Sequence, residues 1–583
     1  MTNEGVNLPR VTNRKIADIF NEIADLLDID GDNPFKVRAY RNAARTILGY
    51  SREMSDLVEE GFDLTSLRGI GKELAKKITE IVQTGKLAYL EKLRKTHPPQ
   101  LEELLKIPGL GPGRVRLLHE LLLINSLEDL EKALREGKLE KVPGFGDKLI
   151  AKIENGIQTR RYEAHRFKLS EALPVAEWII RILKKTKGAA HVEIAGSLRR
   201  RKETVHDIDL VAACEETNDT MVYFLNLPKI QKIVMKGTTR STILLENGMS
   251  VDLRVVPLES FGATLHHFTG SKAHNITLRK MAVEKGLKIN EYGIWKEEKR
   301  IGGEREQDIY DAFDMQYIEP EMRENRGEIT LAQKHALPKL ITQTDIRGDL
   351  HMHTSYSDGL ASIEEMAQQA KALGYEYIAI TDHTEHLKVA HGMDEKRVRA
   401  QLEEVDALNE KLEGITILKS AEVDILEDGS LDMPKSILEA LDLTVCSVHT
   451  KFNLSREKQT QRILKAMDNP HFTILAHPTG RIIGLREPYA LDMEAVMQKA
   501  KEKGCILELN AQPDRLDLND IHCKMAKQMG VHIAISTDAH SLKDLELMRY
   551  GIWQARRGWL GKENVVNTLS LSAFQTLLGA IKS

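Results

Sequence analysis

The sequence is poor in cysteine, lacks long apolar runs and carries no large excess of charge. Its four cysteines are isolated, with no Cys-x-x-Cys pair, which argues against a disulfide framework or a cysteine-ligated zinc and fits a reducing cytosol. No stretch approaches the ~18 to 20 unbroken apolar residues of a membrane helix, and the N-terminal segment has no apolar core of a secretory signal. The net charge is −4, and neither the part before residue 330 nor the part after it is a basic region that would bind nucleic acid through bulk charge. We therefore expect a cytoplasmic protein without a membrane partner.

The length of the chain predicts several domains. At 583 residues it is too long for one hydrophobic core, so three or four domains of ~100–200 residues are expected. Short amphipathic helical patterns fill the first 160 residues or so. Strand-like and helical segments then alternate, a linker with one short helix follows, and the alternation resumes to the end of the chain.

A glycine motif occurs three times in the helical first part. Each copy places a Gly-x-Gly turn before a helix that has Lys or Arg in it or beside it. The glycines lay the backbone bare, and the unpaired N–H groups of the following helix can bind a phosphate without reading a base. Any single copy could be an ordinary helical hairpin, but three copies favour helix-hairpin-helix contacts to DNA. The predicted DNA-binding residues are Gly69, Gly71, Gly109, Gly111, Gly144 and Gly146.

Three aspartates in the middle third are placed to hold metal ions. Asp207 and Asp209 are two residues apart in a strand-like segment, so their side chains point to the same face. Asn247-Gly248 predicts a hairpin, and the strand after it carries Asp252. Carboxylates gathered on one face suit Mg²⁺ or Mn²⁺, which also hold substrate phosphates. The alternative is a solvated Asp-x-Asp at a strand edge, but the preceding Gly196-Ser197 turn favours the metal site.

These segments resemble the nucleotidyltransferase superfamily and, more narrowly, the family X DNA polymerases typified by polymerase beta. The resemblance covers residues 1 to about 325. GIGKELAKKI matches the lyase domain, GSLRRRKETVHDIDL and VDLRVVP match the palm, and FTGSKAHN and LRKMAVEKGLKINEYGI match the nucleotide-selecting subdomain. It implies an α+β palm in which Asp207, Asp209 and Asp252 are the catalytic metal ligands.

The resemblance also implies a nucleotide pocket with contacts to the triphosphate, the sugar and the nascent base pair. Its residues are Ser197, Arg200 and Arg166 at the triphosphate, Phe268 and Gly270 at the sugar, and Asn275 and Arg279 at the minor groove, with Lys272 in the same pocket. The match departs from the family at two positions. His267 stands where the family often has tyrosine, and Lys272 where polymerase beta has aspartate, which leaves sugar selectivity open.

Lys77 matches the Schiff-base lysine of the lyase domain and is a candidate catalytic residue. A lysine nucleophile needs a lowered pKa, which repulsion from Lys72 and Lys76 would favour. The alternative is that Lys77 contacts a phosphate at a DNA end. Phe35, at the position of a histidine in polymerase beta, favours this alternative.

Histidines and acids end successive strand-like runs in the last 240 residues. Apolar runs such as YIAIT and HIAIST alternate with helical segments, which is typical of an α/β barrel with its active groups at the carboxyl ends of the strands. Nine convergent ligand-type residues would be costly to bury without a metal, and their mixture suits two or three Zn²⁺, Mn²⁺ or Fe²⁺ ions that hydrolyse phosphodiesters. The predicted ligands are His351, His353, Asp358, His383, Glu422, His449, His477, Asp538 and His540.

This part is similar to the polymerase and histidinol phosphatase (PHP) domain over roughly residues 345 to 575. The matching segments are HMHTSYSDG, TDH, AEVDI, SVHT, AHPTGR and STDAH. The resemblance implies a distorted (β/α)7 barrel with a trinuclear metal centre. Arg481 and Lys451 are candidates for holding the scissile phosphate, and solvated surface positions are the alternative for both.

Together these observations predict six segments. They are a lyase-like helix-hairpin-helix domain at 1–95, a second helix-hairpin-helix domain at 96–163, the palm at 164–260, the nucleotide-selecting subdomain at 261–326, a linker at 327–344 and the PHP barrel at 345–583. We interpret the chain as a monomeric DNA-directed DNA polymerase that fills short gaps in base excision repair. Its partners would be gapped or primed double-stranded DNA and dNTPs.

The barrel is interpreted as a metal-dependent 3′–5′ exonuclease, and cleavage at abasic sites is open beside that activity. Two other functions stay open. The barrel could act as a small-molecule phosphomonoesterase, or the chain could act mainly as a scaffold that binds DNA ends.

Overall fold

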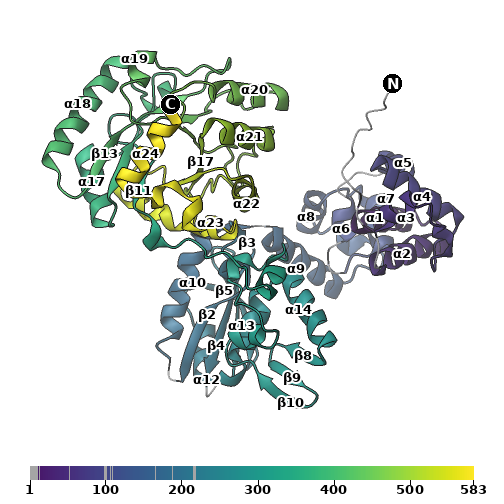
Figure 1. Ribbon diagram of the computed structural model, residues 1–583. Helices are drawn as coiled ribbons and strands as arrows, with labels where there is room; N and C mark the ends of the chain where they lie inside the picture. Colours follow the sequence, from purple (N-terminus) through teal and green to yellow (C-terminus); the bar gives the residue numbers. More distant parts are fainter. Residues whose placement is uncertain are drawn as a thin grey trace. The chain divides into compact units, whose positions relative to one another are not determined.

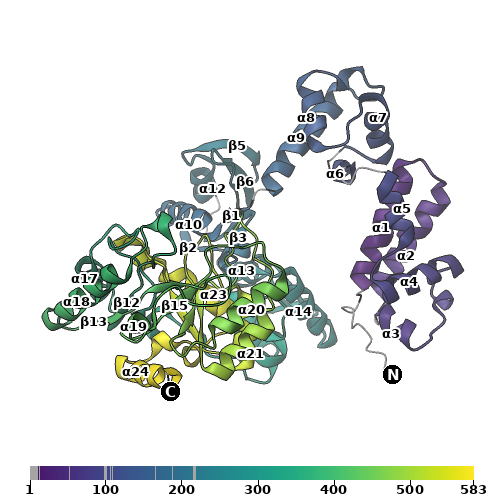
Figure 2. The same ribbon diagram turned by 90° about the horizontal axis from the view of Figure 1, so that it is seen from above.

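The computed structural model describes residues 11–582 apart from 12, 51–52, 97–100, 106, 108, 165, 187 and 215–217. The chain forms two compact units that divide between residues 165 and 166 (Figures 1 and 2). The finer division into six segments stays a prediction, and the first ten residues and Ser583, which it assigns to the end segments, lie outside the described residues. Among the described residues, no helix has both the length and the apolar character needed to cross a bilayer.

The first unit is helical. Its helices are α1 (Asn13–Ile29), α2 (Pro34–Gly49), α3 (Met54–Glu59), α4 (Lys72–Thr84), α5 (Ala88–Thr96), α6 (Leu101–Leu105), α7 (Pro112–Leu122), α8 (Leu127–Arg135) and α9 (Asp147–Ala164). Their apolar faces form two cores, one that includes Phe20 and Ile78 and another that includes Leu118 and Phe145.

The three glycine motifs adopt the same local structure. The first glycine of each is left-handed, with φ of 82°, 104° and 85° at Gly69, Gly109 and Gly144, a conformation that favours glycine. The second glycine adjoins the next helix, and Gly71 and Gly111 are the N-caps of α4 and α7. The predicted hairpins are therefore present, each with bare backbone at the start of a helix.

A five-stranded mixed sheet organises the start of the second unit. Its elements are α10 (Leu169–Leu183), β2 (Ala189–Ile194), α11 (Gly196–Arg199), β4 (Asp207–Cys214), α12 (Asn218–Leu225), β5 (Ile230–Met235), β6 (Arg240–Leu245) and β7 (Ser250–Val256). The strand order is β2-β4-β7-β6-β5, in which β4 and β7 are parallel and the other neighbours antiparallel. Asn247-Gly248 forms the predicted hairpin between β6 and β7. The short strands β1 (Phe167–Lys168) and β3 (Thr204–Val205) pair beside the sheet.

The next segment combines helices with a small antiparallel sheet. It contains α13 (Phe261–Thr269), α14 (Lys272–Glu284), β8 (Leu287–Asn290), β9 (Gly293–Lys296), β10 (Lys299–Gly302) and α15 (Gln307–Asp311). The predicted linker holds one short helix, α16 (Glu328–Gln333).

Parallel strands of the C-terminal part form two sheets, which isolated bridges join into a ring. They are β11 (Gly348–Asp349), β12 (Tyr377–Ile380), β13 (Thr416–Lys419), β14 (Glu422–Asp424), β15 (Val445–Ser447), β16 (Ile474–Leu475), β17 (Ile506–Asn510) and β18 (Ile533–Ser536). β13 and β14 are consecutive parts of one interrupted strand, since β12 pairs with β13 and His383 bridges to Glu422. A bridge between Met352 and Ala539 closes the ring. This arrangement agrees with the expected barrel of seven strands.

Helices surround the ring and cover its amino-terminal end. They are α17 (Ile363–Ala372), α18 (Glu395–Lys411), α19 (Lys435–Leu438), α20 (Arg456–Ala466), α21 (Met493–Lys503), α22 (Asp520–Met529), α23 (Met548–Arg557) and α24 (Leu571–Lys582). Phe574 of α24 stacks on Tyr377 with ring centroids 5.5 Å apart, within a core of inward-facing strand residues. This apolar core fills the amino-terminal end of the ring, so polar side chains can gather at the carboxyl ends of the strands.

Candidate functional site

Two neighbouring strands bring the three palm aspartates to one edge of the sheet. β4 and β7 run in parallel, and their register places Asp209 directly opposite Asp252, with Asp207 two residues before Asp209. Thr242 on β6 donates a hydrogen bond to Asp252 Oδ1 over 2.8 Å, and Arg240 Nε donates to the same oxygen over 3.1 Å. The acids therefore lie together near the amino ends of the two strands.

Burial and mutual repulsion disfavour the charged forms of these acids. Burial, together with Asp207 and Asp252, raises the pKa of Asp209 to about 7, and burial and Asp252 raise the pKa of Asp207. A bound cation would relieve this repulsion. The three acids are not among the groups of described residues whose ligand atoms all lie within 4.8 Å of one another.

A short turn places the predicted triphosphate contacts beside the acids. α11 begins at Gly196, and Ser197 follows within it. The guanidinium of Arg200 donates to the carbonyl oxygen of Thr269, and its Nε lies 3.1 Å from Glu324 Oε1. Arg200 is also close enough to Asp209 to favour the charged form of that acid.

Arg166 is bound to the segment that precedes the acids. Its Nε donates to Thr204 Oγ1 and its Nη2 to Thr204 O, each over 2.6 Å, and Nη1 lies 2.5 Å from His206 Nε2. Because His206 adjoins Asp207, Arg166 lies near the acids, but its guanidinium nitrogens already have partners.

The predicted sugar contacts lie at the turn from α13 to α14. Gly270 is left-handed, with φ of 68°, and the Arg254 guanidinium lies 3.7 Å from the ring centroid of Phe268. Asn275 Nδ2 donates to His267 O over 2.7 Å, while its buried Oδ1 has no hydrogen-bond partner.

Two further predicted contacts lie on α14. Lys272 is the exposed first residue of the helix. Arg279 Nε donates to Asn275 O over 3.3 Å, one turn along the same helix. Asn275 and Arg279 thus lie together, and Lys272 lies at the helix start beside Gly270.

A buried ion network supports this pocket and was missed from the sequence. Glu306 Oε2 lies 2.6 Å from Arg199 Nη2 and accepts a hydrogen bond from Tyr317 over 2.9 Å, and Glu306 Oε1 accepts from Arg323 Nη1 over 2.7 Å. Arg199 also donates to Thr269 Oγ1 over 2.8 Å. Burial opposes the charged form of Glu306, but the two arginines outweigh it and lower the pKa of this carboxyl. The network joins α11 to the segment after α15.

All nine predicted barrel ligands converge at the carboxyl ends of the strands. Among the described residues they form three overlapping groups whose ligand atoms lie within 4.8 Å of one another. The groups are His353, Asp358, His383 and His540; His351, His353 and Asp538; and His383, Glu422 and His449. His477 joins them through Nε2, which lies 3.0 Å from Glu422 Oε1.

The buried polar atoms of this centre fit metal ions. Three imidazole nitrogens lie 2.8, 3.4 and 3.5 Å from Glu422 Oε2, those of His383, His351 and His353. None of these nitrogens is oriented to donate a hydrogen bond to this oxygen. The buried Nδ1 atoms of His353 and His477 also have no hydrogen-bond partner. Such burial is costly unless cations are shared between the groups. Mixed nitrogen and oxygen ligands are those that Zn²⁺, Mn²⁺ and Fe²⁺ accept.

Two buried carboxylates that sequence reasoning missed orient these ligands. Glu508 Oε1 lies 2.7 Å from His351 Nδ1, and Glu508 Oε2 accepts from the backbone N–H of His477 over 2.7 Å. Asp424 Oδ1 lies 3.2 Å from His449 Nδ1. Burial opposes the charged form of His449, but nearby carboxylates outweigh it and raise its pKa to about 10. An acid within an apolar strand, as in CILELN, is the signal that could have found Glu508.

The cations near this centre differ from those expected. Arg481 Nη2 lies 2.7 Å from Glu203 Oε2 of the palm segment, so its guanidinium is committed to that ion pair. Lys451 Nζ lies 3.4 Å from an exposed glutamate. Arg515, which sequence reasoning missed, has its Nε 3.6 Å from Asp538 Oδ2 and lies beside the ligands.

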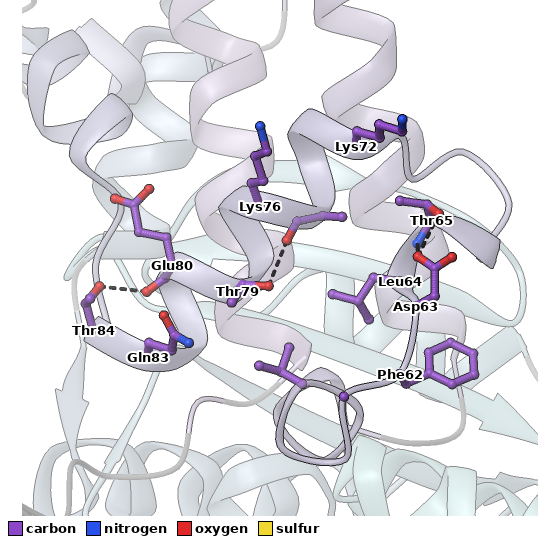
Figure 3. A pocket seen from close by; sticks show the side chains of 13 residues that line it. Phe62, Asp63, Leu64, Thr65, Lys72, Lys76, Thr79, Glu80, Gln83 and Thr84 are labelled. Atoms are coloured by element: carbon purple, nitrogen blue, oxygen red, sulfur yellow. Dashed lines mark hydrogen bonds between the residues drawn. The ribbon is translucent and has the colours of Figure 1, made fainter.

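Lys77 lies beside an aromatic ring. Its Nζ lies 5.2 Å from the ring centroid of Tyr89, and Lys36 Nζ lies 5.3 Å from the same ring. Lys72 and Lys76 instead line a pocket of about 610 Å³ between α4 and the loop before it, of which Lys77 is not a lining residue (Figure 3). The expected repulsion of Lys77 by Lys72 and Lys76 stays a prediction.

Comparison with known families places most of these segments. A helix-hairpin-helix model matches residues 11–87, a SAM-like helix-hairpin-helix tandem 101–158, a DNA polymerase beta thumb 264–324 and a PHP domain 349–511. The chain is 39% identical over 571 residues to a Bacillus subtilis protein named DNA polymerase/3′–5′ exonuclease PolX, which covers 97% of this chain and 99% of that protein. The chain belongs to the PolX family. The predicted fold class, with helix-hairpin-helix domains, a polymerase beta-like palm and a PHP domain, is thereby confirmed.

Shorter proteins match part of this PolX chain. A protein of Thermoanaerobacter sp. (strain X514) named probable phosphatase is 32% identical over 231 residues, 38% of this chain and 89% of that protein. A probable phosphatase of Caldanaerobacter subterraneus subsp. tengcongensis is 32% identical over 208 residues, 34% of this chain and 77% of that protein.

Proposed function

We propose that this PolX chain is a DNA-directed DNA polymerase that fills short gaps in base excision repair and that its barrel is a 3′–5′ exonuclease. The observation that carries the proposal is the presence of two separate ligand sets, one in the palm and one in the barrel, in a chain that aligns over 97% of its length with DNA polymerase/3′–5′ exonuclease PolX. It acts as a cytoplasmic monomer on gapped or primed double-stranded DNA.

In the palm, Asp207, Asp209 and Asp252 would hold two Mg²⁺ or Mn²⁺ ions. These ions, when bound, supply the positive charge that activates the primer 3′-hydroxyl and stabilises the leaving pyrophosphate. Ser197 and Arg200 orient the dNTP triphosphate so that its α-phosphate faces the hydroxyl. Asp209 has to be deprotonated to act as a ligand, which cation binding favours because it offsets the burial that raises the pKa of this acid.

The remaining nucleotide contacts follow from the turn between α13 and α14. Phe268 and Gly270 bound the sugar, and Asn275 and Arg279 face the minor-groove edge of the nascent pair. The unpaired Asn275 Oδ1 supports this role, since a buried acceptor without a partner is unfavourable unless a ligand binds it.

The helix-hairpin-helix glycines hold the DNA on either side of the gap. The N–H groups that start α4, α7 and α9 donate to backbone phosphates, a contact that does not depend on sequence. Lys77 and Lys36, which share the ring of Tyr89, contact a phosphate at a DNA end.

In the barrel, the nine ligands would hold two or three Zn²⁺, Mn²⁺ or Fe²⁺ ions. Such ions, when bound, supply a hydroxide near neutral pH and neutralise the scissile phosphate. Glu508 and Asp424 fix the ring orientation of His351 and His449, and Arg515 lies where it can approach a phosphate oxygen.

Two substitutions in the full chain test the proposal. On a 5′-phosphorylated single-nucleotide gap with Mn²⁺, Asp207→Ala should abolish dNTP incorporation and leave 3′-end degradation within about twofold. His351→Ala should do the opposite. If either change removed both activities from protein with an unchanged unfolding temperature, the two-site proposal would be wrong.

A phosphomonoesterase is the second candidate for the barrel. The similarity to two proteins named probable phosphatase, over about a third of the chain, favours it. The full chain can be given p-nitrophenyl phosphate and a 3′-recessed oligonucleotide in parallel. We expect faster turnover of the oligonucleotide, and much faster release of p-nitrophenol would favour the alternative.

A further inference from the structure

The palm loop that carries Arg200, residues 200–203, is held by the PHP barrel. α23 of the barrel lies beside this part of the palm (Figure 1). The contacts are Arg557 Nη1 donating to Arg200 O over 2.7 Å, the Arg201 guanidinium 4.2 Å from the ring centroid of Trp553, and Arg481 Nη2 2.7 Å from Glu203 Oε2. The loop is therefore fixed along its length by a domain with a different chemical task.

Arg557 contacts the backbone of Arg200 and shares a carboxylate with its side chain. Its Nη1 also lies 3.2 Å from Glu324 Oε1, the same oxygen that lies 3.1 Å from Arg200 Nε. Its Nη2 lies 2.6 Å from Asp520 Oδ2, which fixes the plane of the guanidinium from within the barrel. The Arg557 side chain is 2% exposed, so these contacts are shielded from water.

The cluster around Arg557 has more positive than negative charge. Arg200, Lys202, Arg326 and Arg557 share the carboxylates of Glu324 and Asp520. Excess positive charge around the buried Arg200 and Arg557 guanidinium groups favours an anionic ligand. The cluster meets the nucleotide pocket at Arg200, whose Nη1 would lie 3.3 Å from a Cβ on Gly270. A triphosphate bound at Arg200 would supply the negative charge that balances this excess.

We propose that Arg557 is a positioning residue for the polymerase site. It holds the Arg200 backbone and shares Glu324, so that the Arg200 guanidinium is available to the dNTP triphosphate. Without Arg557, the Arg200 carbonyl loses its donor, and Glu324 binds Arg200 and Lys202 more strongly, in competition with the nucleotide. The inference rests on the proposed contact between Arg200 and the triphosphate.

The experiment measures single-nucleotide gap filling and 3′-end degradation by full-length variants. Arg557→Gln should raise KM for dNTP about tenfold with a smaller change in kcat, and leave degradation within about twofold. Arg557→Lys keeps the charge, but lysine has no planar group that reaches the carbonyl and both carboxylates at once. Its KM for dNTP should therefore lie between those of the wild-type chain and Arg557→Gln. Arg556→Gln is the matched control, because the adjacent Arg556 joins the barrel to Glu321 over 2.7 Å without contacting the loop.

The outcomes separate this inference from the proposed function. Equal KM increases in Arg556→Gln and Arg557→Gln would mean general loosening of the interface and would overturn the inference. If KM for dNTP were unchanged in Arg557→Gln but raised in Arg200→Ala, the positioning role of Arg557 would be overturned. The proposed contact between Arg200 and the triphosphate would still be supported. An unchanged KM in Arg200→Ala would overturn the triphosphate contact itself. Retained 3′-end degradation shows in each case that the variant is folded.

Discussion

Gly196 leaves no room for a side chain beside Asp209. A Cβ on Gly196 would lie 2.1 Å from Asp209 Oδ2, and Gly196 is left-handed, with φ of 62°. The backbone N–H of Ala195, the residue before it, donates to Asp209 O over 2.8 Å. The turn that carries the proposed triphosphate contacts therefore packs directly against Asp209, a proposed metal ligand. Only glycine at position 196 permits this close approach.

Gly196→Ala should lower the rate of gap filling at least about 100-fold, while 3′-end degradation continues. The methyl group would displace the Asp209 carboxylate, and misplacement of a reacting group by ~1 Å can cost about 100-fold. Gly286→Ala is the matched control, because Gly286 has a similar φ of 68° but no atom within 4 Å of an added Cβ. Equal losses in the two variants would show that backbone strain, and not contact with Asp209, decides the effect.

Local patterns predicted the residue types of both ligand sets. The spacing of Asp207 and Asp209 placed them on one face of a strand, and the ends of apolar runs identified residues such as His351 and Glu422, because these relations extend over a few residues. The glycine turns were predictable for the same reason, since a left-handed residue before a helix is a local requirement.

Contacts between distant segments could not be predicted in this way. Glu508 contacts His351 across 157 positions, and Arg557 contacts the Arg200 carbonyl across 357. A strand pattern tells which side chains reach the end of a barrel, but not which acid faces which imidazole. The place of Tyr89 beside Lys77 could not be predicted for the same reason, because the packing of α4 against α5 determines it.

Glu508→Gln should lower the metal content of the barrel. Its carboxylate accepts a hydrogen bond from the protonated Nδ1 of His351, 2.7 Å away, which leaves Nε2 free to bind a metal. We expect about 10- to 100-fold weaker metal retention, measured as metal per chain after dialysis, with gap filling unchanged. Glu376→Gln, which alters an exposed pair with Arg347, serves as the control. Full metal content in Glu508→Gln would contradict the orienting role.

Gly71→Ala should weaken DNA binding without destabilising the chain. Gly71 has an ordinary φ of −85°, and an added Cβ would meet no atom within 4 Å, so the fold itself accepts alanine. A phosphate at the start of α4 would meet the methyl group. We expect about tenfold weaker binding to gapped DNA, or ~1.4 kcal/mol, at an unchanged unfolding temperature. Gly579→Ala in α24, which is equally open, should bind DNA normally. Unchanged affinity in Gly71→Ala would argue against backbone contact at this hairpin.

Glu306→Gln should destabilise the chain at neutral pH and by less in acid. Glu306 is the carboxylate between Arg199 and Arg323, and removing one partner of a buried ion pair costs about 3–5 kcal/mol. Because the arginines lower the pKa of Glu306 below its ordinary value of 4.5, its stabilising effect is complete above that pH and is lost progressively as the pH falls below it.

The unfolding temperatures of the wild-type chain and Glu306→Gln, measured from pH 8 to pH 3.5, should therefore converge only below about pH 4.5. Glu439→Gln, in an exposed pair with Lys435, should follow the wild type at every pH. A difference that stayed constant down to pH 3.5 would mean that glutamine disturbs packing, and that the charge of Glu306 contributes little. The wild-type chain would then lose stability in acid through other carboxylates, such as Asp520 and Glu324, whose pKa values arginines also lower against the opposing effect of burial.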